Sequence, residues 1–394
     1  MVNITQAVAV PHRYEALDGL RGICAIFVCL FHFRANGPLA TLDFVRGSWL
    51  FVDFFFVLSG FVIAANYRES LVAGKFLRRF VILRLGRLYP LHAFMLLCFV
   101  VVELAAAAFA GDGVMRRQAF DSGHSVYAIL TNLTLTQAFG LHPRLTWNQP
   151  SWSIAVEFWT YLLFALAALW AGAGLEKWLG LAVIVCAAVL MMVTNYGINV
   201  SHAWSIFRCV YGFAVGALLW RLCQHGGVVP RRVWRGATFF ELAAVVAVVV
   251  FVSLFSATRF NLLSPLVFGG AIVVFAAESG AISRWLTTAP FRWLGVLSYS
   301  IYMVHSFVQS WADDLLRLVG KLVGVRLLAQ TTLPNGLNRE LVGATPLMGV
   351  IFTLLMLLVV IGVSQLTWRY VEIPGQRWSR RLAMRDHEAS GVSA

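Results

Sequence analysis

Charged side chains are scarce in this sequence of 394 residues, since Asp, Glu, Lys and Arg together make up only 12% of it. Soluble domains carry about 25%. Apolar residues make up 60%, so a chain of this length lacks the polar side chains that it would need to cover a water-exposed surface. The composition therefore excludes a soluble globular enzyme, a disordered chain and a secreted disulfide scaffold.

Cysteine is also infrequent, and its spacing carries no signature of a metal or redox site. The six cysteines form no Cys-x-x-Cys pair, and no histidine stands at the spacing of a zinc ligand. Each cysteine lies in or at the edge of an apolar stretch. We interpret them as small buried side chains and expect no metal site.

Acidic residues are few, with 18 Asp and Glu against 31 Lys and Arg, which gives a net charge of +13. In membrane proteins Lys and Arg accumulate in cytoplasmic loops for reasons of topology, so this excess does not indicate a nucleic-acid partner. We expect membrane lipid as a partner and no nucleic acid.

Long apolar stretches predict an all-α integral membrane protein, because about 20 mainly apolar residues suffice to span a bilayer as a helix. We expect a bundle of about ten transmembrane helices, at 17–35, 49–66, 88–110, 151–171, 178–195, 204–222, 237–256, 262–277, 295–312 and 345–368. The weaker stretch 126–140 is rich in Thr and Asn and is interpreted as a re-entrant or surface helix. No internal repeat is seen, so the inverted repeats of many transporters are unsupported.

Basic residues concentrate in two predicted loops, 67–87 and 223–236, and in the segment after 368. The positive-inside rule places these three regions in the cytoplasm. Both termini are then cytoplasmic, which requires an even number of spans and agrees with ten. We expect a transmembrane domain over 1–376 and a short polar cytoplasmic tail over 377–394.

The first predicted helix carries two ionisable side chains, Arg21 and His32. Eleven residues are close to three helical turns, so both lie on one face, about 16 Å apart along the axis. Ionisable groups within a membrane are costly and are functional candidates by default. We therefore interpret the pair as part of a site.

The second predicted helix holds Asp53 in a dense aromatic run, followed by Ser59 and Gly60. Small residues let neighbouring helices approach closely, so we assign Ser59 and Gly60 to packing. Two interpretations of Asp53 stay open at this point: it serves the site, or it pairs with a nearby arginine such as Arg46.

Four arginines precede the third predicted helix, at Arg78, Arg79, Arg84 and Arg87. If this segment is helical, Arg84 and Arg87 share a face. Arginine suits phosphate groups through its planar fork of donors. The alternative is that these charges only set topology or anchor lipid headgroups.

Two further predicted helices carry polar stripes. Ser153 and Glu157 share a face of the fourth helix, after Asn148 and Trp152. Glu157 lies about two turns from the outer end, a depth similar to that of His32, so the two side chains are expected to be able to pair. In the ninth helix the polar stripe consists of Ser298, Tyr302, His305 and Gln309.

Taken in order, these motifs resemble those of the membrane-bound acyltransferase 3 family. They are Arg21-x10-His32, the segment from Asp53 to Phe61, Arg84-x-x-Arg87-Leu-Tyr-Pro, Ser151-Trp152-Ser153 with Glu157, Leu294-Gly295 to His305, and Tyr370-Val371-Glu372-x-Pro374. The resemblance covers about residues 14–376. It implies a ten-helix bundle of the inner (plasma) membrane that transfers an acyl group, commonly acetyl from acetyl-CoA, to hydroxyls of cell-surface glycans.

By this resemblance His32 is the essential histidine, Arg21 its motif partner, and Arg84 and Arg87 the arginines on the coenzyme side, joined by Arg78 and Arg79. We expect acyl-CoA as a co-substrate, no bound cofactor, and a carbohydrate acceptor. Because an imidazole titrates near neutral pH, His32 suits a general base for a hydroxyl, and Glu157 and Arg21 are the other two residues that we assign to catalysis. Covalent transfer through His32 is the alternative mechanism. Residues expected to line the acceptor side of the site are Asp53, Asn148, Trp152, Ser153, Tyr302 and His305.

Two other functions are compatible with the composition: a transporter or flippase without acyl transfer, and a non-catalytic assembly subunit. The sequence is also compatible with a homo-oligomer. The favoured hypothesis needs one continuous passage, in which a coenzyme from inside and a sugar from outside both reach His32.

Overall fold

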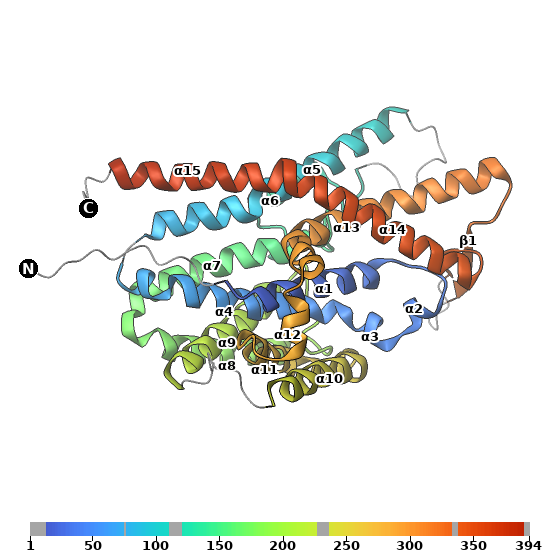
Figure 1. The fold of residues 1–394 in the computed structure, drawn as a ribbon. Helices are drawn as coiled ribbons and strands as arrows, with labels where there is room; N and C mark the ends of the chain where they lie inside the picture. Colours follow the sequence, from blue (N-terminus) through green and yellow to red (C-terminus); the bar gives the residue numbers. More distant parts are fainter. Residues whose placement is uncertain (1–12, 75, 110–119, 227–235, 333–337, 390–394) are drawn as a thin grey trace, which may run out of the picture.

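The protein forms a bundle of long helices in a computed structural model that describes residues 13–74, 76–109, 120–226, 236–332 and 338–389. The long helices are α1 (Glu15–His32), α4 (Phe51–Val72), α5 (Leu77–Phe109), α7 (Ser151–Ala171), α8 (Leu175–Val193), α9 (Ser205–Gly226), α10 (Ala237–Phe255), α11 (Ser264–Ala276), α13 (Ala289–Val323), α14 (Pro346–Thr367) and α15 (Ile373–Ala389). Short helices are α2 (Pro38–Thr41), α3 (Asp43–Arg46), α6 (Val126–Leu133) and α12 (Ala281–Leu286). In Figure 1, α1 lies in the middle of the bundle, between α5 with α15 on one side and α8, α10 and α11 on the other.

The chain is an all-α membrane protein, apart from a short antiparallel hairpin of β1 (Leu328–Thr332) and β2 (Asn338–Val342). Within the described residues, seven stretches are long and apolar enough to cross a bilayer. They are Ser48–Val72, Leu77–Ala105, Ser151–Val193, Ser205–His225, Ala237–Phe255, Arg259–Ala276 and Pro346–Met384. The stretch Ser151–Val193 contains both α7 and α8. Neither α1 nor α13 is among the seven, because both helices carry polar side chains that line internal cavities. The number of ten spans and the cytoplasmic termini stay predictions.

The basic segment 67–87, predicted as a loop, is mostly helical. Helix α4 continues to Val72, and α5 begins at Leu77, so Arg78 and Arg87 both lie in about the first three turns of α5. Hydropathy marks where an apolar stretch begins, whereas Arg and Leu are good helix formers on either side of that boundary. The predicted tail is also helical up to Ala389, where α15 packs along α5 (Figure 1).

Helix α6 confirms a short helix at the start of the stretch 126–140. It is eight residues long, and Ser125 caps its N-terminus by accepting a hydrogen bond from the backbone N–H of Ala128. Tyr127 and Leu130 are exposed on it. The helix thus lies at the edge of the bundle, as expected for a surface helix.

Glycines bring the backbones of α4 and α9 into direct contact. A Cβ atom added at Gly60 would overlap the carbonyl of Phe213, and one added at Gly216 would overlap the carbonyl of Val57. Small residues permit this approach between membrane helices. The assignment of Gly60 to packing is therefore confirmed.

Replacing Gly60 by Ala should destabilise the bundle, because the added methyl group meets backbone rather than a flexible side chain. We expect a loss of about 1–3 kcal/mol, as for other overpacked sites, measured as a lower thermal unfolding midpoint in detergent. Gly270 in α11 is the matched control, since a Cβ there meets nothing within 4 Å. Equal midpoints for G60A and G270A would contradict the close packing of α4 on α9.

Candidate active site

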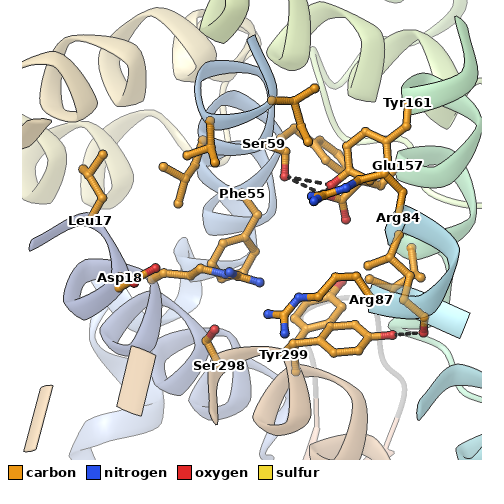
Figure 2. Close-up of a pocket in the computed structure, with 18 of the residues that line it drawn as sticks. Leu17, Asp18, Phe55, Ser59, Arg84, Arg87, Glu157, Tyr161, Ser298 and Tyr299 are labelled. Atoms are coloured by element: carbon orange, nitrogen blue, oxygen red, sulfur yellow. Dashed lines mark hydrogen bonds between the residues drawn. The ribbon is translucent and has the colours of Figure 1, made fainter. Parts of the chain in front are cut away.

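Helices α1, α4, α5, α7, α13 and α15 enclose a cavity of about 520 Å³, which we name the arginine cavity. Its polar lining residues are Arg13, Tyr14, Asp18, Arg21, Ser59, Asn66, Tyr67, Arg84, Arg87, Ser153, Glu157, Tyr161, Ser298, Tyr299, Tyr302 and Arg380. Figure 2 shows Arg84 and Arg87 reaching from one side of this cavity and Asp18 lying across from them. The predicted residues Arg21, Arg84, Arg87, Glu157, Ser153 and Tyr302 are thus brought together here.

The charge of the arginine cavity is strongly positive, since five arginines face two carboxylates, Asp18 and Glu157. Two arginines have acidic partners: Arg13 bonds Asp18 at 2.7 Å, and Arg87 bonds the buried Glu372, the last residue before α15. Among the described residues, Arg21, Arg84 and Arg380 have no carboxylate partner. A polar cavity with surplus cations inside a membrane protein favours an anionic ligand.

Arg84 is held in place by aromatic side chains rather than by an acid. Its guanidinium donates to the Tyr67 hydroxyl at 2.9 Å and lies 4.9 Å from the centre of that ring. Its Nε is buried without a hydrogen-bond partner within the described part of the chain. A cation fixed in this way keeps most of its donors for a ligand.

Arg78 and Arg79 do not line the cavity. They lie about one and a half turns before Arg84 on α5, and the Arg79 guanidinium lies 5.6 Å from the centre of the Phe76 ring. The predicted coenzyme arginines therefore divide into two that line the cavity and two that lie outside it.

Glu157 is bonded to hydroxyl groups, not to His32. Its Oε1 accepts hydrogen bonds from Ser59 and Tyr161, both at 2.5 Å (Figure 2). The expected pairing with His32 is therefore wrong: similar depth on two helices does not fix the direction in which each side chain points. The assignment of Ser59 to packing is also wrong, because its hydroxyl lines the cavity.

Asp53 belongs to a buried ion pair outside the arginine cavity. Arg208 on α9 binds its carboxylate with two hydrogen bonds, each 2.8 Å, and the two side chains are 0% and 2% exposed. The guanidinium lies between the rings of Trp49 and Trp152, at 5.1 and 5.3 Å. Of the two interpretations of Asp53, pairing with an arginine is therefore confirmed, but the partner is Arg208 and not Arg46, which meets Asp43 at the surface.

The remaining acceptor-side candidates connect α7 to α13. Ser153 and Tyr302 share a hydrogen bond of 2.7 Å, and both line the arginine cavity. The Asn148 amide donates to the Met303 carbonyl at 2.9 Å, and its own carbonyl oxygen has no partner among the described residues. The ring of Trp152 contacts the guanidinium of Arg208, which is the ion-pair partner of Asp53.

His32 lies in a second cavity of about 400 Å³, which we name the histidine cavity. Its polar lining residues are His32, Arg34, Glu103, Asp121, His124, Arg144, Gln149, Ser306, Gln309, Ser310 and Asp314. The aromatic residues Phe99, Trp147 and Trp311 line it as well. This mixture of hydroxyl, amide, carboxylate and aromatic groups suits a polar ligand with apolar faces.

The two cavities share no lining residue in the described part of the chain. The expected continuous passage is therefore absent from this structure, and neighbouring rings connect the lining of one cavity to that of the other. Tyr302 lines the arginine cavity, and its ring centre lies 5.9 Å from that of His305. The His305 ring lies 4.9 Å from that of His32. The rings of Tyr302 and His305 thus lie in sequence between the arginine cavity and His32.

Sequence reasoning missed Arg208, Tyr161, Tyr299 and the role of Glu372. Arg208 had a signal, since it is a charged residue near the start of an apolar helix. Glu372 was recognised as part of the family motif, but no partner was predicted for it. Its carboxylate accepts hydrogen bonds from Arg87 and Ser300. The tyrosines carried no distinguishing pattern.

An internal polar site in an all-α membrane bundle is typical of both membrane enzymes and transporters. The comparison with known families decides between these two classes. The sequence model of the family described as an acyltransferase domain matches residues 14–369 of this chain. The chain therefore belongs to the acyltransferase 3 family. This confirms the predicted family and makes the protein an acyltransferase.

Curated relatives agree with this membership. The chain is 27% identical to a putative membrane-bound transacylase, BcsY, of Komagataeibacter xylinus, over 75% of this chain and 72% of that protein. It is 25% identical to the acyltransferase MdmB of Streptomyces mycarofaciens, over 77% and 81%. It is 25% identical to the peptidoglycan O-acetyltransferase OatA of Listeria monocytogenes, over 74% of this chain and 48% of that protein. No solved structure matches.

Proposed function

We propose that the protein transfers an acyl group, in the first instance acetyl, from acyl-CoA to a hydroxyl of a cell-surface or exported glycan. The observation that carries this proposal is the pair of polar cavities, one rich in arginine and one containing His32, separated by the rings of Tyr302 and His305. A reaction between a cytoplasmic donor and an external acceptor needs two such sites, and it requires these two rings to move apart so that the acyl carbon reaches His32.

The arginine cavity suits the donor. Coenzyme A is a polyanion, and Arg21, Arg84 and Arg380 make no ion pair with a carboxylate among the described residues. The pantetheine arm is thin enough to extend past Ser59 and Ser153 toward Tyr302. With Arg78 and Arg79 at the same end of α5, this cavity faces the cytoplasm in the ten-span, termini-inside topology of the inner membrane.

The histidine cavity suits the acceptor. Its aromatic rings offer stacking surfaces for sugar faces, and its amides and carboxylates offer partners for hydroxyls. His32 donates from Nδ1 to the Val28 carbonyl at 2.8 Å, which leaves Nε2 as the unprotonated nitrogen. As general base, Nε2 takes the proton of the attacking hydroxyl. The relative that acts on peptidoglycan favours a glycan as the source of that hydroxyl.

Acetyl-CoA turnover by the purified full-length protein in detergent tests this function. Release of free CoA should depend on an added glycan, and mass analysis should find an acetyl ester on that glycan. Absence of turnover with every acyl-CoA and glycan pair, together with glycan movement across vesicles that contain the protein, would replace the proposal with a flippase.

Replacing Arg21 or Arg84 by Ala should raise the KM for acyl-CoA by about 10–100-fold, because each removes a charge-assisted hydrogen bond to a phosphate. Titration of acyl-CoA at fixed acceptor concentration measures this effect, and the KM for the acceptor should change little. Arg284→Ala is the matched control, since that arginine is exposed on α12 and bonds the Ser279 carbonyl. If the KM for the acceptor rises instead, these arginines bind the acceptor and not acyl-CoA, and the assignment of the arginine cavity to the donor is wrong.

A further inference from the structure

A second imidazole, that of His305, lies beside His32 and has no role in the reaction as proposed above. His305 lies on α13 with its ring centre 4.9 Å from that of His32, and the planes are tilted by 44°. It is 0% exposed, so neither lipid nor bulk water reaches it in this structure. The two rings come from helices that pack closely along each other, α1 and α13.

Hydrogen bonds to the backbone fix which nitrogen of each ring carries the proton. Nδ1 of His305 lies 3.1 Å from the Ile301 carbonyl, as Nδ1 of His32 does from that of Val28 at 2.8 Å. A carbonyl oxygen only accepts, so Nδ1 is the N–H in both rings and Nε2 is the free base in both. Each histidine thus repeats the same bond to the carbonyl four residues before it.

Nε2 of His305 is buried without a hydrogen-bond partner among the described residues. Buried polar atoms are almost always satisfied, and one that is not needs an explanation in terms of a ligand or a changing protonation state. Two unprotonated nitrogens cannot bond to each other, whereas a proton that arrives on one of them can be shared between both. The unsatisfied state is therefore the one before a proton arrives.

We infer that His305 is a positioning residue that shares the proton taken by His32, so that the two imidazoles act as one base. This inference rests on the proposed acyl transfer. The acceptor oxygen forms a bond to the acyl carbon, the carbon–sulfur bond breaks, and its electron pair leaves with the CoA sulfur. The hydroxyl proton passes to Nε2 of His32, is stabilised there by Nε2 of His305, and finally protonates the released thiolate.

Other charged and titratable groups face this pair from the elements around it. They are Arg34 after α1, Glu103 on α5, Asp121, His124 and Arg144 between α5 and α7, Asp314 on α13, and Tyr302 on the side of the arginine cavity. The Asp121 carboxylate is bonded to both His124 and Arg144. A substitution at His305 leaves all of these groups in place, so a change in the pH dependence reports on His305 itself.

The test compares His305→Asn and His305→Gln with wild type in the acetyl-CoA and glycan assay over pH 5–9. An Asn amide nitrogen can keep the bond to the Ile301 carbonyl, but the variant lacks any atom at Nε2. A Gln oxygen can occupy the Nε2 position and accept a bond from protonated His32. We expect H305N to lower kcat at least tenfold and to move the acid limb of the kcat profile down by about one to two pH units, because protonated His32 loses a hydrogen bond.

H305Q should recover part of kcat and part of the shift, and the KM for acyl-CoA should stay the same in both variants. His225→Ala, an exposed histidine at the end of α9, controls for the loss of a histidine. A monodisperse H305N protein with a wild-type pH profile would overturn the inference, even if its rate were low. Wild-type protein without turnover would instead overturn the proposed function, so the two failures are distinguishable.

Discussion

His32→Asn should lower acyl transfer by about 10²–10⁴-fold, the usual contribution of a general base. The Asn amide can keep the hydrogen bond that His32 makes to the Val28 carbonyl, so the end of α1 keeps its structure while Nε2 is lost. His32→Ala should be equally inactive. The measurement is acceptor-dependent release of CoA by protein purified in the same detergent, with His225→Ala as the matched control.

The same variants separate the two roles that the sequence leaves open for His32. If His32 carries the acyl group, labelled acetyl should accumulate on wild-type protein when the acceptor is omitted, and His32→Asn should remove the label. If His32 is a base, no label accumulates in either protein. Full activity of His32→Asn would exclude both roles and move the chemistry to another group, of which Glu157 in the arginine cavity is the nearest candidate.

Helices were predictable from this sequence because apolar stretches of the required length are separated by basic or polar segments. The prediction 151–171 coincides with α7, and 237–256 and 345–368 agree with α10 and α14 to within a residue. Where charged residues continue a helix, as in α5, hydropathy gave the start about eleven residues too late. Helix propensity on both sides of the boundary explains this difference.

Several residues that line the cavities were predictable from the sequence, but their pairing was not. Spacing within one helix correctly placed Arg21 and His32 about three turns apart, but the interpretation of the pair as parts of one site is wrong, because the two side chains line different cavities. Pairing between helices depends on how each helix is rotated about its axis, which spacing within one helix does not determine. Glu157 therefore meets Ser59 rather than His32, and Asp53 meets Arg208, which is 155 residues away.

Arg208→Ala should cause the largest loss of stability, about 3–5 kcal/mol, because it leaves the Asp53 carboxylate buried without its cation. The pair joins α4 to α9, and Trp152, whose ring centre lies 5.3 Å from the guanidinium, extends the contact to α7, which carries Ser153 and Glu157. The measurement is the thermal unfolding midpoint and the monodisperse fraction in detergent. Arg46→Ala removes an exposed arginine whose partner Asp43 is 71% exposed, and it should change neither quantity.

A double variant, Asp53→Leu with Arg208→Met, distinguishes the cost of an unpaired charge from the value of the pair itself. Replacing both partners by apolar side chains removes the uncompensated charge, so most of the stability should return. If the double variant folds but transfers acyl groups slowly, the ion pair sets the position of α7 and through it the geometry of the arginine cavity. If it is no more stable than Arg208→Ala alone, the loss comes from the contacts of the guanidinium with Trp49 and Trp152, and the account of an uncompensated carboxylate is wrong.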